Sequence, residues 1–126
     1  MILVDTSVWI SHYRESNAEL VDLLNEGRVL THAFVRGELA CGNLKDRAGT
    51  LRLHEALPHA ARVHDDEVLA FIEARKLAGR GLGWVDLHLL ASTLLTPDAL
   101  LWTRDGRLAE AADEHGVAYR SQNDVG

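Results

Sequence analysis

The first ten residues constrain the fold most strongly, because a short, wholly apolar run ends abruptly at an acid. Ile2, Leu3 and Val4 precede Asp5, and hydroxyl residues that can cap a helix follow it. An apolar run of this length is typical of a strand buried on both faces of a parallel sheet. An acid at the carboxyl end of such a strand faces the crevice in which open α/β sheets bind ligands. The chain is therefore predicted to be an α/β protein with a polar site at that edge.

Strands and helices alternate along the rest of the chain with short connections, which favours a parallel sheet covered by helices on both faces. The predicted strands are residues 2–4, 28–31, 61–63, 100–103 and 117–119. The predicted helices are residues 7–14, 17–26, 34–41, 46–57, 65 or 66 to 78, 84–95 and 107–112. Gly27 is expected to end the second helix at positive φ, and residues 122–126 are expected to form a frayed tail.

Composition and charge limit the class of protein. With 126 residues, 47% hydrophobic and 25% charged, the chain is expected to form one domain over residues 1–126. It has a single cysteine, no secretory signal pattern and no apolar stretch near the roughly 20 residues that cross a bilayer, so we expect a cytoplasmic protein without membrane contacts. The net charge of −6 argues against a general nucleic-acid coat. It does not exclude a nuclease, because acids filled by divalent cations present positive charge locally.

Four acids are candidates for one metal site. Asp5 follows the first strand, Glu38 lies within a predicted helix, and Asp86 and Asp105 each open a helix. Asp105 repeats the strand, acid, helix order of Asp5, so both are expected at the same edge of the sheet. Asp98 stands before that later strand, at its opposite end, and is not expected to join them. Helix capping is the alternative explanation for the three aspartates, and a solvated position on a helix surface is the alternative for Glu38.

Oxygen ligands alone favour a hard cation, Mg²⁺ or Mn²⁺, over zinc or copper. The seven histidines show no zinc spacing, and one cysteine cannot complete such a pattern. Without a cation, several neighbouring acids repel one another and raise the pKa of at least one of them. Gly37, beside Glu38, costs a helix about 1 kcal/mol relative to alanine, which suggests the close approach of a ligand or another backbone.

Basic and aromatic side chains supply the candidates for substrate contacts. Arg80 is the favoured phosphate contact, because it lies in the glycine-rich run 79–83 just before Asp86. The other candidate phosphate contacts are Arg14, Lys45, Arg47 and Arg104. Three tryptophans can stack on bases, although the apolar neighbours of Trp102 favour core packing there; the other two are Trp9 and Trp84.

Together these motifs resemble the PIN domain, and especially the VapC toxins of bacterial and archaeal toxin–antitoxin pairs. The resemblance spans almost the whole chain and lies in Asp5-Thr6-Ser7, Glu38, the helix from Trp84-Val85-Asp86, and Thr103-Arg104-Asp105. It implies a three-layer α/β/α sandwich around a mostly parallel sheet. It also implies a Mg²⁺- or Mn²⁺-dependent endoribonuclease that leaves 5′-phosphate and 3′-hydroxyl ends, a VapB-type antitoxin that covers the site, and a homodimer.

Carried over residue by residue, the resemblance makes the four acids both metal ligands and catalytic groups: Asp5, Glu38, Asp86 and Asp105. Glu38 or Asp105 would act as the base that takes a proton from water. Thr6 or Ser7, together with Thr103, would orient the acids or hold a substrate phosphate. Arg80 and Arg104 would contact the RNA.

Two other functions are alternatives to the nuclease. A Mg²⁺-dependent phosphotransfer or phosphatase-like domain also gathers acids at strand ends. It would need a second aspartate where Ser7 stands, or a lysine after a late strand, where Trp102-Thr103-Arg104 has none. A non-catalytic binding module would use its acids only as helix caps, and the apolar residues of the first two helices suit a partner groove as well as a core.

Overall fold

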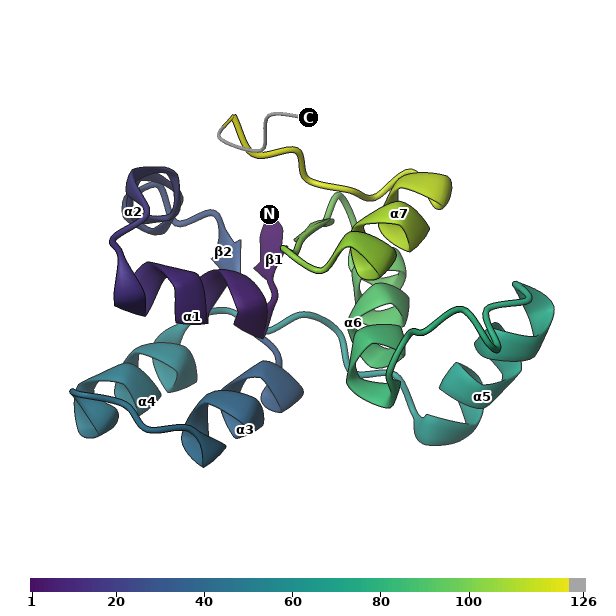
Figure 1. Cartoon of the computed structure of the whole chain (residues 1–126), viewed down its shortest axis with the longest axis horizontal. Coiled ribbons are helices and arrows are strands. Elements are labelled where there is room, and N and C mark those ends of the chain that lie inside the picture. The colour runs from purple at the N-terminus through teal and green to yellow at the C-terminus, as the bar shows by residue number, and fades with distance from the viewer. Residues whose placement is uncertain (123–126) are drawn as a thin grey trace.

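The computed structural model describes residues 1–122, so the predicted tail lies outside the described residues except for Gln122. Strands and helices alternate as the sequence predicts, and all seven predicted helices are found, one over the predicted residues 84–95 and the others with shifted ends (Figure 1). Their order is β1 (Ile2–Val4), α1 (Thr6–Arg14), α2 (Ala18–Asn25), β2 (Val29–Leu30), α3 (Ala33–Cys41), α4 (Arg47–Ala56), α5 (Asp65–Ala74), α6 (Trp84–Leu95), β3 (Leu100–Trp102) and α7 (Gly106–Glu114). In this part of the chain, no helix is long and apolar enough to cross a membrane.

The described strands form a parallel sheet in the order β2-β1-β3. In the central strand, Leu3 is aligned with Leu30 of β2 and with Leu101 of β3, and Val4 is aligned with Trp102. Helices α1, α3 and α4 lie on one side of this sheet, and α6 and α7 lie on the other (Figure 1). This is the predicted three-layer α/β/α arrangement.

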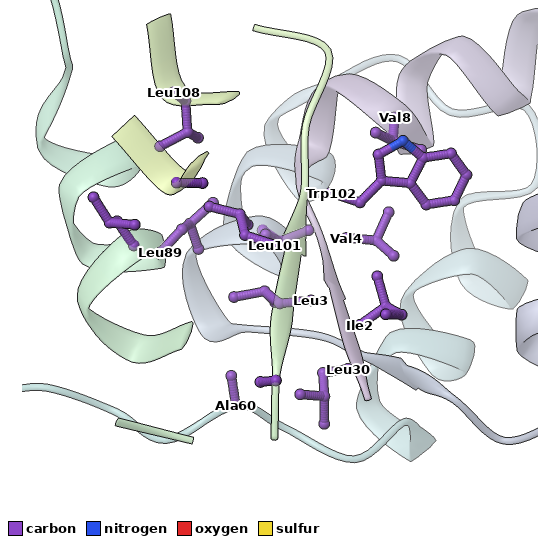
Figure 2. Packing of buried hydrophobic residues seen from close by; sticks show 14 of the residues in the cluster. Ile2, Leu3, Val4, Val8, Leu30, Ala60, Leu89, Leu101, Trp102 and Leu108 are labelled. Carbon is purple, nitrogen blue, oxygen red and sulfur yellow. The ribbon is translucent and has the colours of Figure 1, made fainter. Parts of the chain in front are cut away.

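Side chains of the two longer strands alternate between the two layers of the core, as the period of a strand requires. Figure 2 shows one set facing α1 and the other facing α6 and α7. The first set comprises Ile2, Val4, Val8 and Trp102, and the second comprises Leu3, Leu89, Leu101 and Leu108; each is at most 2% exposed. Each such burial contributes about 1.5–3 kcal/mol. The carboxyl ends of β1 and β3 are therefore fixed by a well-packed core.

Two predicted strands were wrong within the described residues. Residues 61–63 are irregular, and the nearby pairing is a single bridge between Thr31 and His59. Strand β2 ends at Leu30 and offers no ladder to extend, while Ala60 and Val63 fill the core without belonging to a sheet. Residues 117–119 run beside β3 with two backbone hydrogen bonds to Leu101, but they form only one bridge.

Helix α5 ends four residues earlier than predicted, because its chain turns at Lys76. That residue adopts a φ of 54°, and the Leu77 amide bonds to the Ile72 carbonyl at 3.0 Å. Together with the bond from the Lys76 amide to the Glu73 carbonyl, this is a Schellman cap, and it buries Leu77. The same cap ends α2 with Gly27 at a φ of 67°, which confirms that prediction.

The glycine-rich run before α6 needs its glycines at two positions. Gly79 and Gly81 have φ values of 75° and 79°, in the left-handed region that side chains disfavour. A Cβ on Gly81 would also lie 2.5 Å from Nη1 of Arg107, whose side chain covers the loop. The run therefore forms a turn that connects the end of α5 to α6 and lies against α7.

Candidate active site

Asp5 lies at the carboxyl end of the central strand and is only 6% exposed. It occupies the position before α1, yet its side chain accepts no hydrogen bond from the helix amides, so capping does not explain it. Its Oδ2 instead accepts hydrogen bonds from Ser7 Oγ at 2.7 Å and from Thr103 Oγ1 at 2.8 Å. A buried carboxylate at a sheet edge, oriented by two hydroxyls, is suited to holding a ligand.

The two hydroxyls also fasten the loop that follows β3. The amide of Arg104 donates to Ser7 Oγ, and the amide of Asp105 donates to Thr103 Oγ1, both at 3.0 Å. Ser7 and Thr103 therefore each accept one bond from the loop and donate one to Asp5. Both hydroxyls thus connect Asp5 to the loop after β3, and their orienting role in a metal site stays a prediction.

Thr6 connects α1 to the predicted glutamate. Its Oγ1 donates to Glu38 Oε1 at 2.7 Å, across 32 positions in the sequence. Glu38 is exposed on α3, while Thr6 is buried beside Asp5. The adjacent Gly37 has no atom within 4 Å of the place a Cβ would occupy, so nothing within the described chain approaches it closely.

Asp86 and Asp105 do act as helix caps. Asp86 Oδ2 accepts from the Gly83 amide at 2.9 Å, and Asp105 Oδ1 accepts from the amides of Arg107 and Leu108 at 2.9 and 3.1 Å. Burial raises the pKa of Asp86, and the charges of Asp5 and Asp105 raise it further, against the opposing effect of the Gly83 amide. The charges of Asp5 and Asp105 therefore act on Asp86, although the three aspartates come from distant parts of the sequence.

The four acids fit a hard divalent cation by their chemistry. Within residues 1–122 each acid uses one oxygen in hydrogen bonds and keeps the other free; the engaged atoms are Asp5 Oδ2, Glu38 Oε1, Asp86 Oδ2 and Asp105 Oδ1. The donor set is oxygen only, which suits Mg²⁺ or Mn²⁺. No three His, Cys, Asp or Glu side chains in this range are drawn together into a cluster that could hold an ion as it stands. Without a cation, like charges favour such separation.

The predicted RNA contacts lie in different surroundings. Arg104 is exposed next to Asp105, and its Nη1 donates to Ser11 Oγ at 3.1 Å. Arg80 instead forms a bidentate ion pair with Glu114 on α7, with both bonds at 2.8 Å. Trp9 and Trp102 are buried in the core, whereas Trp84 at the start of α6 is 42% exposed.

Ser11 is a site residue that the sequence analysis missed. It holds Arg104 close to the acids through the bond to its hydroxyl. Its spacing was the available signal, because residues four apart share a helix face, and Ser11 follows Ser7 by four positions on α1.

Comparison with known proteins gives consistent matches over the whole site. The family model of the PIN domain matches residues 2–114. The chain is also similar to two proteins of Mycobacterium tuberculosis, each named Ribonuclease VapC32, from strains CDC 1551 / Oshkosh and ATCC 25618 / H37Rv. Each is 50% identical to the chain over 122 residues, which cover 97% of this chain and 98% of the relative.

Proposed function

This chain belongs to the PIN-domain family, and from that premise we propose that it is a metal-dependent endoribonuclease, the toxin of a toxin–antitoxin pair. Its relatives with 50% identity are named as ribonucleases of the VapC type, and they match over nearly their full length. The observation that carries the proposal is Asp5, a buried carboxylate that does not cap its helix. Two hydroxyls hold it, and it lies within electrostatic reach of Asp86.

We propose that Asp5, Asp86 and Asp105 would hold Mg²⁺ or Mn²⁺ through their free oxygens, with Glu38 as the fourth acid of the site and the one least tied to the cation. A bound divalent cation supplies Lewis acidity that neutralises the phosphodiester and acidifies water. Glu38 is the proposed base, because Thr6 occupies its Oε1 and leaves Oε2 to accept the proton of the attacking water. Asp105 suits that role less well, since two helix amides hold its Oδ1 and with it the orientation of the carboxylate. Cleavage on this scheme leaves 5′-phosphate and 3′-hydroxyl ends.

Arg104 is the proposed first contact with an RNA phosphate. It is exposed, adjacent to Asp105, and already positioned by Ser11. Arg80 would have to leave Glu114 to reach RNA, which costs little because water and salt screen an exposed ion pair. The rest of the proposal follows the family: a VapB-type antitoxin, a homodimer, one catalytic domain spanning residues 1–126, and a cytoplasmic location.

Calorimetric titration of the purified, antitoxin-free protein with Mn²⁺ tests whether the distant acids form one site. We expect Asp5→Asn and Asp86→Asn each to abolish both Mn²⁺ binding and cleavage of single-stranded RNA. Asp98→Asn is the matched control, because Asp98 precedes β3 at the opposite end of the sheet and its φ of 58° suits asparagine. RNA cleavage that survives Asp86→Asn while Mn²⁺ binding is lost would overturn the mechanism.

A further inference from the structure

A groove opens beside the proposed base. It lies between α1, α3 and the loop of residues 42–46 before α4, and it encloses about 610 Å³. Glu38 forms part of its wall, so the groove is continuous with the proposed active site. Binding pockets for small ligands typically measure roughly 300–1,000 Å³, which makes this groove large enough for a nucleotide but not for a duplex.

The apolar part of the groove presents an aromatic ring and an aliphatic side chain. Tyr13 is 37% exposed and Ile10 is 42% exposed, and both line the groove. The Tyr13 ring stacks on the buried Trp9 ring, with centroids 6.0 Å apart and planes 27° from parallel. It is thus backed by the core, and a ring held in this way is a ready stacking surface for a nucleobase.

The charged part of the groove carries two cations without partners. Within residues 1–122, neither the Arg14 nor the Lys45 side chain forms a hydrogen bond or an ion pair, although both residues line the groove. Of the acids in the wall, Glu38 accepts from Thr6, and Asp46 accepts from the Gly49 amide at 3.1 Å. Unpaired cations beside an aromatic ring match the phosphate and base of a nucleotide.

The position of Arg104 extends this row of cations to the acids. Arg104 is bonded to Ser11, which precedes Arg14 by three positions on α1 and therefore lies close to it on the helix surface. A phosphate chain could pass from Arg104 to Arg14 and Lys45 while its bases turn toward the groove. An apolar peptide helix in the groove would remove these cations from water without giving them partners, so their charges favour RNA as the occupant of the groove.

We propose that this groove binds the nucleotide next to the scissile phosphate of a single-stranded RNA, with its base on Tyr13 and Ile10 and its phosphate on Arg14 and Lys45. The inference rests on the proposed function and adds a nucleotide subsite beside the catalytic acids. Base stacking and phosphate contact are sequence-tolerant, so this subsite selects unpaired RNA rather than one sequence.

Two matched pairs of variants test the subsite in the full chain. Lys45→Gln is compared with Lys76→Gln, because these are the only two lysines in the sequence. Lys76 follows α5, a helix that lies apart from α3 and α4 (Figure 1). Tyr13→Leu is compared with Tyr13→Phe, which keeps the ring. The assay measures initial cleavage rates in Mn²⁺ on a pool of single-stranded RNA 12-mers of random sequence, at several salt concentrations.

We expect Tyr13→Leu and Lys45→Gln to lower kcat/KM about tenfold through KM, while the control variants and Mn²⁺ affinity remain as in the wild type. The slope of log kcat/KM against log salt should fall in magnitude by about 0.7 for Lys45→Gln alone. Unchanged KM and salt slope in both test variants, with an active wild type, would overturn the subsite and leave the proposed function standing. Normal cleavage combined with lost inhibition by the antitoxin would also overturn it, because the groove would then be a protein site. A wild type that cleaves none of the pool contradicts the proposed function itself.

Discussion

Replacing Thr103 with valine tests whether the hydroxyls at the strand ends hold the central acid in place. Valine keeps the branched shape but removes Oγ1, which donates to Asp5 at 2.8 Å and accepts from the Asp105 amide at 3.0 Å. A hydrogen bond to a charged group contributes about 1.5–3 kcal/mol, and Asp5 is too buried for water to replace it fully. Ser7 still donates to Asp5, and the Asp105 amide is partly accessible, which limits the loss. We expect about 2 kcal/mol less stability, or roughly 8 °C in Tm for a chain of this size.

Thr93→Val is the matched control for this prediction. Thr93 is 1% exposed, and its hydroxyl donates to the Leu89 carbonyl at 2.7 Å, an oxygen that also belongs to the α6 helical ladder. Valine there leaves no group unpaired, so the expected cost is below about 1 kcal/mol. Urea unfolding measures both variants, and calorimetry should show Mn²⁺ affinity about tenfold weaker for Thr103→Val only. Equal stability and equal Mn²⁺ affinity in the two variants would refute the claim that Thr103 positions Asp5.

Four further substitutions have effects on stability whose signs follow from the structure. Burial raises the pKa of Asp86, so the fold is favoured at a pH below the unfolded-state pKa, where the carboxyl is protonated, and this stability is lost as the pH rises through the folded-state pKa. Without metal, Asp86→Asn should therefore raise Tm at pH 7 and change Tm little near pH 3. Added Mn²⁺ should no longer raise the Tm of this variant. Burial lowers the pKa of His54 to about 4, so stability that is present above pH 6.5 is lost as the pH falls toward 4. In urea unfolding, the free energy of unfolding of His54→Leu should therefore fall by about 2 kcal/mol less than that of the wild type between pH 6.5 and 5. Gly37→Ala should raise the free energy of unfolding by about 1 kcal/mol, because Gly37 lies in a helix with open space beside it, whereas Gly81→Ala should lower it by about 1–2 kcal/mol because of the positive φ of Gly81. Shifts of Tm with the same sign in the two variants would contradict this reasoning.

The sequence predicted those parts of the fold that local pattern decides. The apolar run before Asp5 marked β1, and the breakers at Gly27 and Pro58 marked helix ends close to those observed. Pairing partners were less predictable, because a strand needs a neighbour long enough to pair with. Residues 61–63 have the composition of a strand, but β2 ends at Leu30 and gives them no ladder. The end of α5 was not predictable from local pattern either, because the left-handed turn at Lys76 is explained only by the burial of Leu77.

The candidate site was predictable as far as strand ends determine it. Asp5 and Asp105 follow adjacent parallel strands, and their proximity comes from the order of the elements. Contacts between helices were not predictable, because they depend on how the helices pack. Nothing in the spacing indicates that Thr6 reaches Glu38 or that Arg80 turns to Glu114. The expectation that Gly37 marks a close approach finds no neighbour in the described chain to support it.

Helix capping and metal binding appear as rival explanations for an acid at a helix start, but this site assigns them to different atoms. Asp86 and Asp105 each satisfy helix amides with one oxygen, and Asp5 and Glu38 each accept from hydroxyls with one oxygen. A single engaged oxygen fixes the orientation of a carboxylate, and the second remains for a cation or, in Glu38, for the proton of the attacking water. The bonds also favour the ionised form, which offsets part of the repulsion among the acids. The caps are therefore compatible with the metal site and prepare it, and a substitution that removes a hydrogen-bond donor should disturb metal binding while every carboxylate remains in place.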